Sequence, residues 1–385
     1  MGHYSEYLDK KFNFDQISQE RKRQLEIISR IRGGRDILVY ASDLSRGDPS
    51  IGIDYSDLLP FQDQLDNLKG KEIDIILETP GGIAEVVEDM VKLVRGRYEK
   101  VGIIIPGWAK SAGTIFAMAG DEILMGPMSG LGPIDAQVMM NNKRFSAEAF
   151  LKGLEKIKEE VIKTGKLNAA FIPILQNISP GEIQHCENAQ DFSEKLVTDW
   201  LSEYKFKYWH KHSSTGAEVT VEDKKKRAKE IAGQLCKHSD WLTHARSIKI
   251  GDFQKMKLII EDFSLNAELN DAIMRYYTLL RMSFETTIYK IYETTKSQIY
   301  RFSIPPGKDI SRENKNEIVE IKFECPKCKN VSMIQANLEK KSPLKNTNLP
   351  YPLDNNIFKC PHCGAESDIS KIKLEIEAQT GKNVV

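Results

Sequence analysis

The segment that decides the fold is Glu78–Gln137, which carries the motifs Thr79-Pro80-Gly81-Gly82, Lys110-Ser111-Ala112-Gly113-Thr114 and Leu131-Gly132-Pro133-Ile134-Asp135. Two glycine corners and a serine each follow an apolar run with the length of a buried strand. A serine at such a corner can act as a nucleophile, and backbone N–H groups beside it can bind an oxyanion. The pattern therefore favours a serine hydrolase, and among hydrolases a protease.

Ser111 stands where a strand and a short loop should give way to a helix. This geometry exposes the hydroxyl and leaves the N–H of Ala112 without a helical partner. At Gly81-Gly82, glycine lets the backbone approach a substrate carbonyl closely. By itself, a Pro-Gly-Gly segment between a strand and a helix is more often a plain turn. Its pairing with the Ser111 corner predicts that the N–H groups of Gly82 and Ala112 form an oxyanion hole.

Apolar runs alternate with helical patterns on both sides of these motifs. The runs have the length and composition of buried strands, and the connections between them are short. Such alternation predicts an α/β fold with a mostly parallel sheet. We expect strands at 36–40, 73–77, 101–105 and 122–125, and helices at 58–68, 84–95 and 111–119.

The composition argues against several classes of protein. The 385 residues carry 55 basic and 55 acidic side chains, so the net charge offers no general attraction to nucleic acid or anionic membranes. No apolar run reaches the roughly 18 residues of a membrane span, and the polar N-terminus lacks the apolar segment of a signal peptide. We therefore expect a cytoplasmic protein without a membrane span.

Changes in composition divide the chain into four segments. Residues 1–35 form a charged N-terminal helical segment, and residues 36–302 form the α/β domain with a helical extension. Within the extension, apolar residues at helical spacing predict one long helix over 266–295. Residues 303–320 are a linker and the start of a module, and residues 321–385 form that small module.

Several blocks of the sequence resemble the serine dehydrogenase proteinase family, which is distantly related to Clp-type proteases and to signal peptide peptidase A. The blocks are Glu78–Gly82, Ser111–Thr114, Ala119–Ile123, Leu131–Asp135, Cys186–Trp200 and His238–His244. The resemblance covers about residues 36–260. It implies a ClpP/crotonase-like fold of stacked β-β-α units, so that residues 36–302 would be a Clp-like serine protease domain. "Dehydrogenase" refers to a substrate, and no organic cofactor is implied.

The resemblance also implies roles for individual residues. Ser111 would be the nucleophile, with Gly82 and Ala112 as the oxyanion hole. The family is described with a triad in the order serine, aspartate, histidine, which places the acid at Asp135. The alternative interpretation of Asp135 is an aspartate that caps a turn or a helix.

Two kinds of general base compete for the proton of the nucleophile. We favour His244, which follows Trp241 in a Trp-x-x-His pattern, over His238. Distant relatives use a serine–lysine dyad, and Lys152 lies at a suitable distance along the chain among apolar neighbours. It would have to lose its proton near neutral pH, and an ordinary solvated lysine is the alternative. Lys110 should point away from the site as a surface charge.

Four of the six cysteines form two Cys-x-x-Cys pairs, Cys325 with Cys328 and Cys360 with Cys363. In a reducing compartment such pairs are metal ligands more often than disulfides, and four thiolates satisfy Zn²⁺ in a closed, structural site. We predict a zinc ribbon that unfolds without its metal. The loop between the pairs, residues 329–359, is polar and suited to a β-hairpin.

Three functions fit these patterns. The first is a serine endopeptidase that acts on a protein or peptide, as a homo-oligomer, with a zinc ribbon that binds a protein or nucleic-acid partner. The second is a non-catalytic adaptor that keeps the fold for assembly, and the third is an enzyme of acyl-CoA chemistry, which related folds also host. The intact Ser111 corner favours the first.

Overall fold

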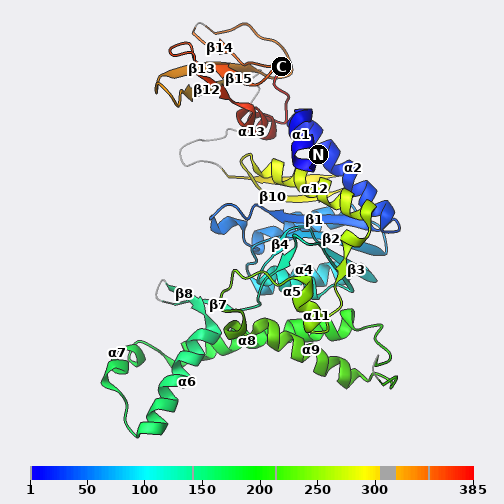
Figure 1. The fold of residues 1–385 in the computed structure, drawn as a ribbon, viewed down its shortest axis with the longest axis vertical. Helices are drawn as coiled ribbons and strands as arrows, with labels where there is room; N and C mark the ends of the chain where they lie inside the picture. Colours follow the sequence, from blue (N-terminus) through cyan, green and yellow to red (C-terminus); the bar gives the residue numbers. More distant parts are fainter. Residues whose placement is uncertain (1, 141–142, 213–214, 304–317, 346) are drawn as a thin grey trace. The chain divides into compact units, whose positions relative to one another are not determined.

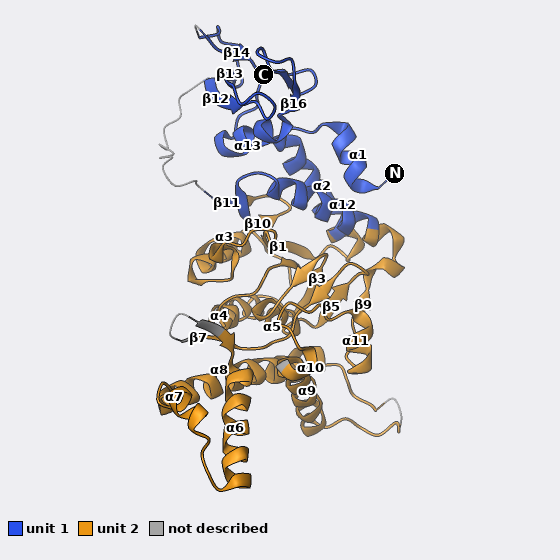
Figure 2. Ribbon diagram, turned by 60° about the vertical axis from the view of Figure 1, so that its left-hand side comes forward, with its two compact units in different colours: residues 1–28, 271–291, 299–385 blue, residues 29–270, 292–298 orange. Residues whose placement is uncertain are grey.

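The computed structural model describes residues 2–140, 143–212, 215–303, 318–345 and 347–385. Contacts divide the chain into two compact units (Figure 2). Unit 1 comprises residues 1–28, 271–291 and 299–385, and unit 2 comprises residues 29–270 and 292–298. Most of the linker expected at 303–320 lies outside the described residues, and the four-segment division remains a prediction.

A parallel sheet forms the centre of unit 2 (Figure 1). Except for a short edge strand, its strands are rich in Ile, Val and Leu, and their side chains are buried on both faces, as is typical of parallel sheets covered by helices. The expected α/β fold is confirmed. In spatial order the strands are β1 (Asp36–Ser42), β2 (Glu72–Glu78), β3 (Lys100–Ile105), β5 (Glu122–Met125) and β9 (Glu261–Asp262).

The connections between these strands contain the helices that the sequence predicts. They are α3 (Leu58–Asp66), α4 (Ala84–Arg95) and α5 (Ala112–Met118). A second, short parallel pair, β4 (Trp108–Ala109) with β6 (Gly130–Leu131), lies beyond the carboxyl ends of β3 and β5 in the chain. The candidate site is built around this pair.

After β6 the chain forms a β-hairpin and then a helical region, which Figure 1 shows together at one end of unit 2. The hairpin consists of β7 (Gln137–Met140) and β8 (Lys143–Ser146). The helices are α6 (Ala147–Thr164), α7 (Ile172–Leu175), α8 (Pro180–Trp200), α9 (Val221–Cys236), α10 (His238–Trp241) and α11 (Ile250–Lys255), with a π-helical turn at Leu201–Lys205 and a 3₁₀ turn at Ala169–Phe171.

Unit 1 combines the N-terminal helices with the C-terminal module. Tyr7 and Ile17, from α1 (His3–Lys10) and α2 (Phe14–Ile31), pack with Leu279 and Met282 from α12 (Ala267–Phe284). The single helix expected over 266–295 is wrong. The helix ends at Phe284, and strand β10 (Ile288–Thr294) follows, with β11 (Gln298–Phe302) after it.

The C-terminal module contains a small sheet and a helix. Strand β12 (Ile318–Glu324) pairs antiparallel with β13 (Val331–Asn337), which pairs parallel with β14 (Leu349–Pro350). The hairpin expected within residues 329–359 is therefore wrong, since β13 takes its antiparallel partner from before the first cysteine pair. Strands β15 (Ile357–Lys359) and β16 (Glu366–Asp368) form a second antiparallel pair, and α13 (Ser370–Thr380) follows.

Among the helices that the structure describes, none is both long and apolar enough to cross a lipid bilayer.

Candidate active site

The Ser111 corner joins strand β4 to helix α5. Ser111 has φ 50° and ψ −117°, a backbone conformation that residues with side chains rarely adopt. Strain of this kind persists only where the surroundings hold it, and it is concentrated at functional sites. Tight packing holds it here, because a Cβ at Gly81 would lie 2.8 Å from Ser111 Cβ and a Cβ at Gly113 would lie 2.5 Å from Thr79 Cγ2.

The Gly81-Gly82 corner is fixed from one side by Ile53. The N–H of Ile53 donates to Gly81 O over 2.8 Å, and the N–H of Ile83 donates to Ile53 O over 2.9 Å. Neither bond uses the N–H of Gly82. A Cβ at Gly82 would lie 2.2 Å from Ile53 O, so only glycine fits.

Backbone hydrogen bonds hold the two corners side by side. The N–H of Thr79 donates to Trp108 O, and the N–H of Lys110 donates to Thr79 O, each over 2.9 Å. A Cβ at Gly81 would lie 3.0 Å from the Ala112 nitrogen, so the two corners touch. Within the described residues, the N–H groups of Gly82 and Ala112 have no hydrogen-bond acceptor. Two unpaired donors beside a strained serine are the donor set that an acyl-transfer oxyanion requires.

Asp135 follows β6 in the chain and is buried, with 2% of its surface exposed. Its Oδ1 accepts a hydrogen bond from Ser146 Oγ over 2.5 Å, and its Oδ2 accepts one from Gln137 Nε2 over 2.6 Å. Asp135 does not cap the helix that follows it, because Ser146 is the N-cap of α6. A buried carboxylate held by two donors has a fixed orientation, which a charge partner for a histidine needs.

His244 is brought to Asp135 from more than 100 residues away. Its Nδ1 lies 3.6 Å from Asp135 Oδ2, close enough for an ion pair but beyond hydrogen-bond length, and the nitrogen is buried without a hydrogen-bond partner. The structure thus brings together the predicted acid and the favoured histidine. It does not join His244 to the nucleophile, since among the described contacts the Ser111 hydroxyl has no hydrogen bond.

The two alternative bases differ from His244 in their surroundings. Lys152 lies on α6 with 47% of its side chain exposed, paired with Glu148 and 2.8 Å from Ser239 Oγ. None of its described contacts involves Ser111. His238 begins α10, and its side chain lies outside the described residues.

Lys110, which precedes Ser111, is not the surface charge that we expect from the sequence. It is half-buried rather than a surface charge, and its Nζ lies 2.8 Å from Ser247 Oγ. Burial, with the positive charge of Lys249 as a smaller cause, lowers the pKa of Lys110 to about 8. No local pattern marks this lysine, because the groups it contacts lie from 21 to 137 residues away in the sequence.

The four cysteines of the C-terminal module gather at one point. Their sulfur atoms all lie within 4.8 Å of one another, with Cys325 Sγ 3.7 Å from Cys363 Sγ and Cys328 Sγ 3.7 Å from Cys360 Sγ. A tetrahedron of thiolates at Zn–S distances of about 2.3 Å has S···S edges of about 3.8 Å. The cluster therefore fits a bound metal ion.

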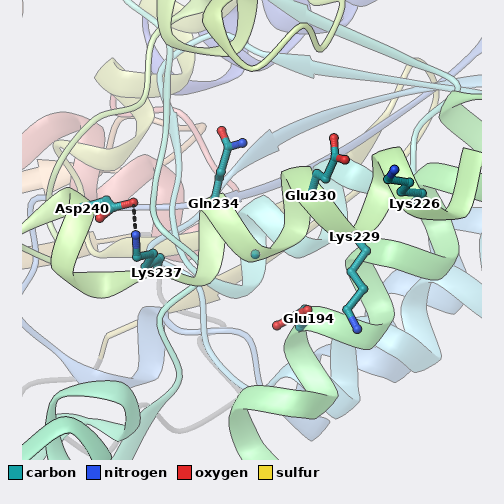
Figure 3. Close-up of a pocket in the computed structure, with 8 residues that line it drawn as sticks. Glu194, Lys226, Lys229, Glu230, Gln234, Lys237 and Asp240 are labelled. Carbon is teal, nitrogen blue, oxygen red and sulfur yellow. Dashed lines mark ion pairs between the residues drawn. The ribbon is translucent and has the colours of Figure 1, made fainter. Parts of the chain in front are cut away.

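A pocket of about 500 Å³ lies elsewhere, along α8 and α9 (Figure 3). Charged and polar side chains line it, including the ion pair of Lys237 with Asp240 at 3.0 Å. None of the candidate site residues lines this pocket, and nothing in it indicates a ligand. Lys226, one of four consecutive basic residues on α9, is among the residues that line it.

Comparison with known proteins gives matches over parts of the chain. Two uncharacterized proteins of Methanocaldococcus jannaschii are 31% identical over 140 residues and 28% identical over 168 residues. These matches cover 34% and 42% of this chain, and 47% and 54% of the relatives, so the chain spans about half the length of the curated relatives it matches.

Among solved structures, two variants of the 1510-N membrane-bound stomatin-specific protease align with the chain. A serine-to-alanine mutant is 15% identical and covers 54% of this chain and 73% of its own, with a TM-score of 0.31. A lysine-to-alanine mutant in complex with a substrate peptide is 16% identical and covers 66% of this chain and 85% of its own, also with a TM-score of 0.31.

The match to a protein family falls on the segment that holds the two corners. Residues 65–220 match the sequence model of a family described as ClpP-like SDH-type serine proteinase. This segment includes Gly82, Ser111, Ala112 and Asp135, whereas His244 lies after it. The resemblance noted in the sequence is confirmed over residues 65–220, which match the ClpP-like SDH-type serine proteinases.

Proposed function

We propose that the chain is a serine endopeptidase in which Ser111 is the nucleophile and Gly82 and Ala112 form the oxyanion hole. The observation that carries this proposal is the contact of the two corners, which leaves two N–H donors without acceptors beside a strained serine. The family of residues 65–220 supports the same chemistry.

In the proposed reaction the Ser111 oxygen attacks the carbonyl carbon of a peptide bond and transfers its proton to His244. The carbonyl oxygen becomes an oxyanion, which the N–H groups of Gly82 and Ala112 bind. His244 then gives the proton to the leaving amine, and an acyl-enzyme remains on Ser111. Water then attacks the acyl carbon while His244 takes its proton. As the bond between the acyl group and the Ser111 oxygen breaks, His244 returns that proton to Ser111 and the carboxylic acid leaves.

Asp135 would orient His244 and stabilise its protonated form. The Nδ1···Oδ2 distance of 3.6 Å has to shorten to about 2.8 Å for a hydrogen bond. Catalytic hydrogen bonds are often long before substrate binds and tighten in the complex. His244 would also have to approach the Ser111 hydroxyl in the same step.

A serine–lysine dyad with Lys152 is the competing mechanism. In that mechanism Lys152 would have to leave Glu148, with which it forms an ion pair, and reach the Ser111 hydroxyl. It would also have to leave Ser239. We therefore favour His244 as the base.

A fluorophosphonate probe tests the proposal. We expect the wild type to be labelled and Ser111→Ala to lose all labelling. His244→Gln and Asp135→Asn should reduce the labelling rate by at least about 10²-fold, because a positioned base contributes roughly this much. Lys152→Met should stay near the wild type. Loss of labelling in Lys152→Met but not in His244→Gln would establish the dyad, and an unlabelled wild type would favour the adaptor.

We further propose that the metal of the cysteine cluster is a structural Zn²⁺. Four thiolates leave no open coordination position, and zinc is the common metal for such a site. Metal analysis of the purified chain should find one zinc per chain, and Cys360→Ser should retain much less. The ribbon's partner, a homo-oligomeric state and a cytoplasmic location remain predictions from the sequence.

A further inference from the structure

The Lys110 side chain crosses the segment that leads to Asp135. It passes directly over Gly132, where a Cβ would lie 2.8 Å from Lys110 Cδ. Its Nζ donates to Leu131 O over 3.3 Å, to Arg246 O over 3.3 Å and to Ser247 Oγ over 2.8 Å. An ammonium has three N–H donors, so these three acceptors can use all of them.

These acceptors belong to the two segments that carry the proposed acid and base. Leu131 precedes Asp135 by four residues, and Arg246 follows His244 by two. Lys110 itself is bonded to the nucleophile through the peptide chain. One side chain therefore spans three segments that are far apart in sequence and meet at the site.

We propose that Lys110 is a positioning residue that fixes the Asp135 and His244 segments against the Ser111 corner. This inference rests on the proposed function, because positioning matters only if these residues act together. Lys110 has no described contact with the Ser111 hydroxyl, so it acts through the segments and not as the base.

The fold itself does not depend on this lysine. Backbone bonds already join the same segments, from Leu131 N–H to Ile248 O over 3.1 Å and from Ile248 N–H to Leu131 O over 2.8 Å. Within the described residues, no carboxylate pairs with the half-buried ammonium of Lys110. Burial also lowers the pKa of this group, which means that the folded chain disfavours its charge. A charge that the fold disfavours is consistent with a role in the reaction more than in stability.

Lys110→Met tests this role, since methionine keeps the length of the side chain and removes the donors. We expect a folded variant with a melting temperature close to that of the wild type. Its maximal rate of fluorophosphonate labelling should fall about 10- to 100-fold, as small misplacements of catalytic groups do. The concentration for half-maximal rate should change little. Lys110→Arg, which keeps the charge and the donors, should recover most of the rate.

Lys249→Met is the matched control. Lys249 is the neighbouring lysine, and its Nζ also contacts backbone carbonyls, those of Met128 at 2.9 Å and Ser129 at 2.6 Å. Its acceptors lie before Leu131 in the chain, so its side chain has no described hydrogen bond to residues 131–135 or to Arg246. Lys249→Met should therefore label within about threefold of the wild type.

Amide hydrogen exchange gives a readout that does not depend on activity. In a Ser111→Ala background, Lys110→Met should speed exchange in residues 131–135 and 244–248, and Lys249→Met should not. The inference fails if Lys110→Met labels like the wild type, if Lys249→Met loses as much rate, or if exchange is unchanged. An unlabelled wild type would instead refute the proposed function, and the inference with it.

Discussion

At Ser111 the backbone conformation favours one type of residue, and the proposed reaction requires another. A residue at φ 50° and ψ −117° is most stable as glycine, because any Cβ is strained there, yet the proposed reaction needs a hydroxyl. The strain of such a residue is of order 1–3 kcal/mol. The surrounding corner therefore holds the nucleophile in place at a cost to stability.

This strain predicts that two inactive variants differ in stability. The free energy of unfolding of Ser111→Gly should be about 1 kcal/mol higher than that of Ser111→Ala, so the glycine variant is more stable. Glycine adopts the backbone conformation freely, whereas alanine keeps the strained Cβ. Both variants should lose fluorophosphonate labelling. Denaturant unfolding of the two proteins measures the difference, and equal stabilities would show that the Ser111 backbone is not strained.

The sequence predicts the positions of corners whose residue types are limited by local backbone chemistry. The glycines at positions 81 and 82 and the Ser111 corner are recognisable because turns and close approaches limit the residue types allowed. The Asp135 position came only from the family resemblance. Lys110 was misjudged because its acceptors are contributed by distant segments, which no local pattern records.

Among the elements, the two Cys-x-x-Cys turns, Cys325–Cys328 and Cys360–Cys363, are alike in geometry but differ in the residue that follows them. Each turns back through a residue with positive φ directly after its second cysteine, Lys329 at 61° and Gly364 at 70°. Each carries the same backbone bond, from the N–H of that residue to the first cysteine's carbonyl, Cys325 O or Cys360 O, over 2.9 Å. Only the second turn uses the residue type that favours this conformation.

This difference predicts that replacing the glycine at 364 and introducing a glycine at 329 have different effects on the stability of the module. Gly364→Ala should destabilise the C-terminal module by about 1 kcal/mol, although nothing lies within 4 Å of a Cβ there. Lys329→Gly should be neutral or slightly stabilising. Competition with a metal chelator measures both, with faster zinc loss expected for Gly364→Ala alone. If Lys329→Gly loses zinc faster as well, the positive φ at these positions is not the cause of the zinc loss.

In the segment after α12, the spacing of apolar residues predicts the wrong secondary structure. Ile288 and Ile291 continue the helical spacing of the apolar residues, but the structure has a strand from Ile288 to Thr294. The stretch Ile288–Thr294 also contains several β-branched and aromatic residues, which favour a strand. A short apolar run suits both structures, and tertiary pairing decides between them.

On the scale of the whole of unit 2, the candidate site and a cluster of ion pairs lie at opposite ends of the parallel strands. The Ser111 and Gly82 corners follow strands at the carboxyl end, whereas an ion-pair cluster occupies the amino end. There Arg32 and Arg35 each contact both Asp74 and Glu122. Gly102 lies between the two acids in the strand register, and a Cβ there would lie 2.1 Å from Asp74 Oδ1.

The cluster gives unit 2 a defined sensitivity to acid. Burial alone would raise the pKa of Glu122, but hydrogen bonds from Arg35, Lys100 and Arg32 outweigh it and lower that pKa well below its usual value of 4.5. A carboxylate with a depressed pKa in the folded state stabilises the fold above the pKa of the unfolded chain. That stabilisation is lost as the pH falls from about 4.5 toward the folded pKa.

Glu122→Gln should therefore lose stability at neutral pH and lose part of the acid sensitivity. We expect a decrease of about 1.5–3 kcal/mol at pH 7, the usual contribution of hydrogen bonds to a charged group, and a smaller difference from the wild type at pH 3. Glu155→Gln removes an exposed partner of Lys158 and should change stability by less than about 0.5 kcal/mol at either pH. Urea unfolding at the two pH values measures both variants. A Glu122→Gln deficit that is as large at pH 3 as at pH 7 would mean that the carboxylate is not charged in the folded protein.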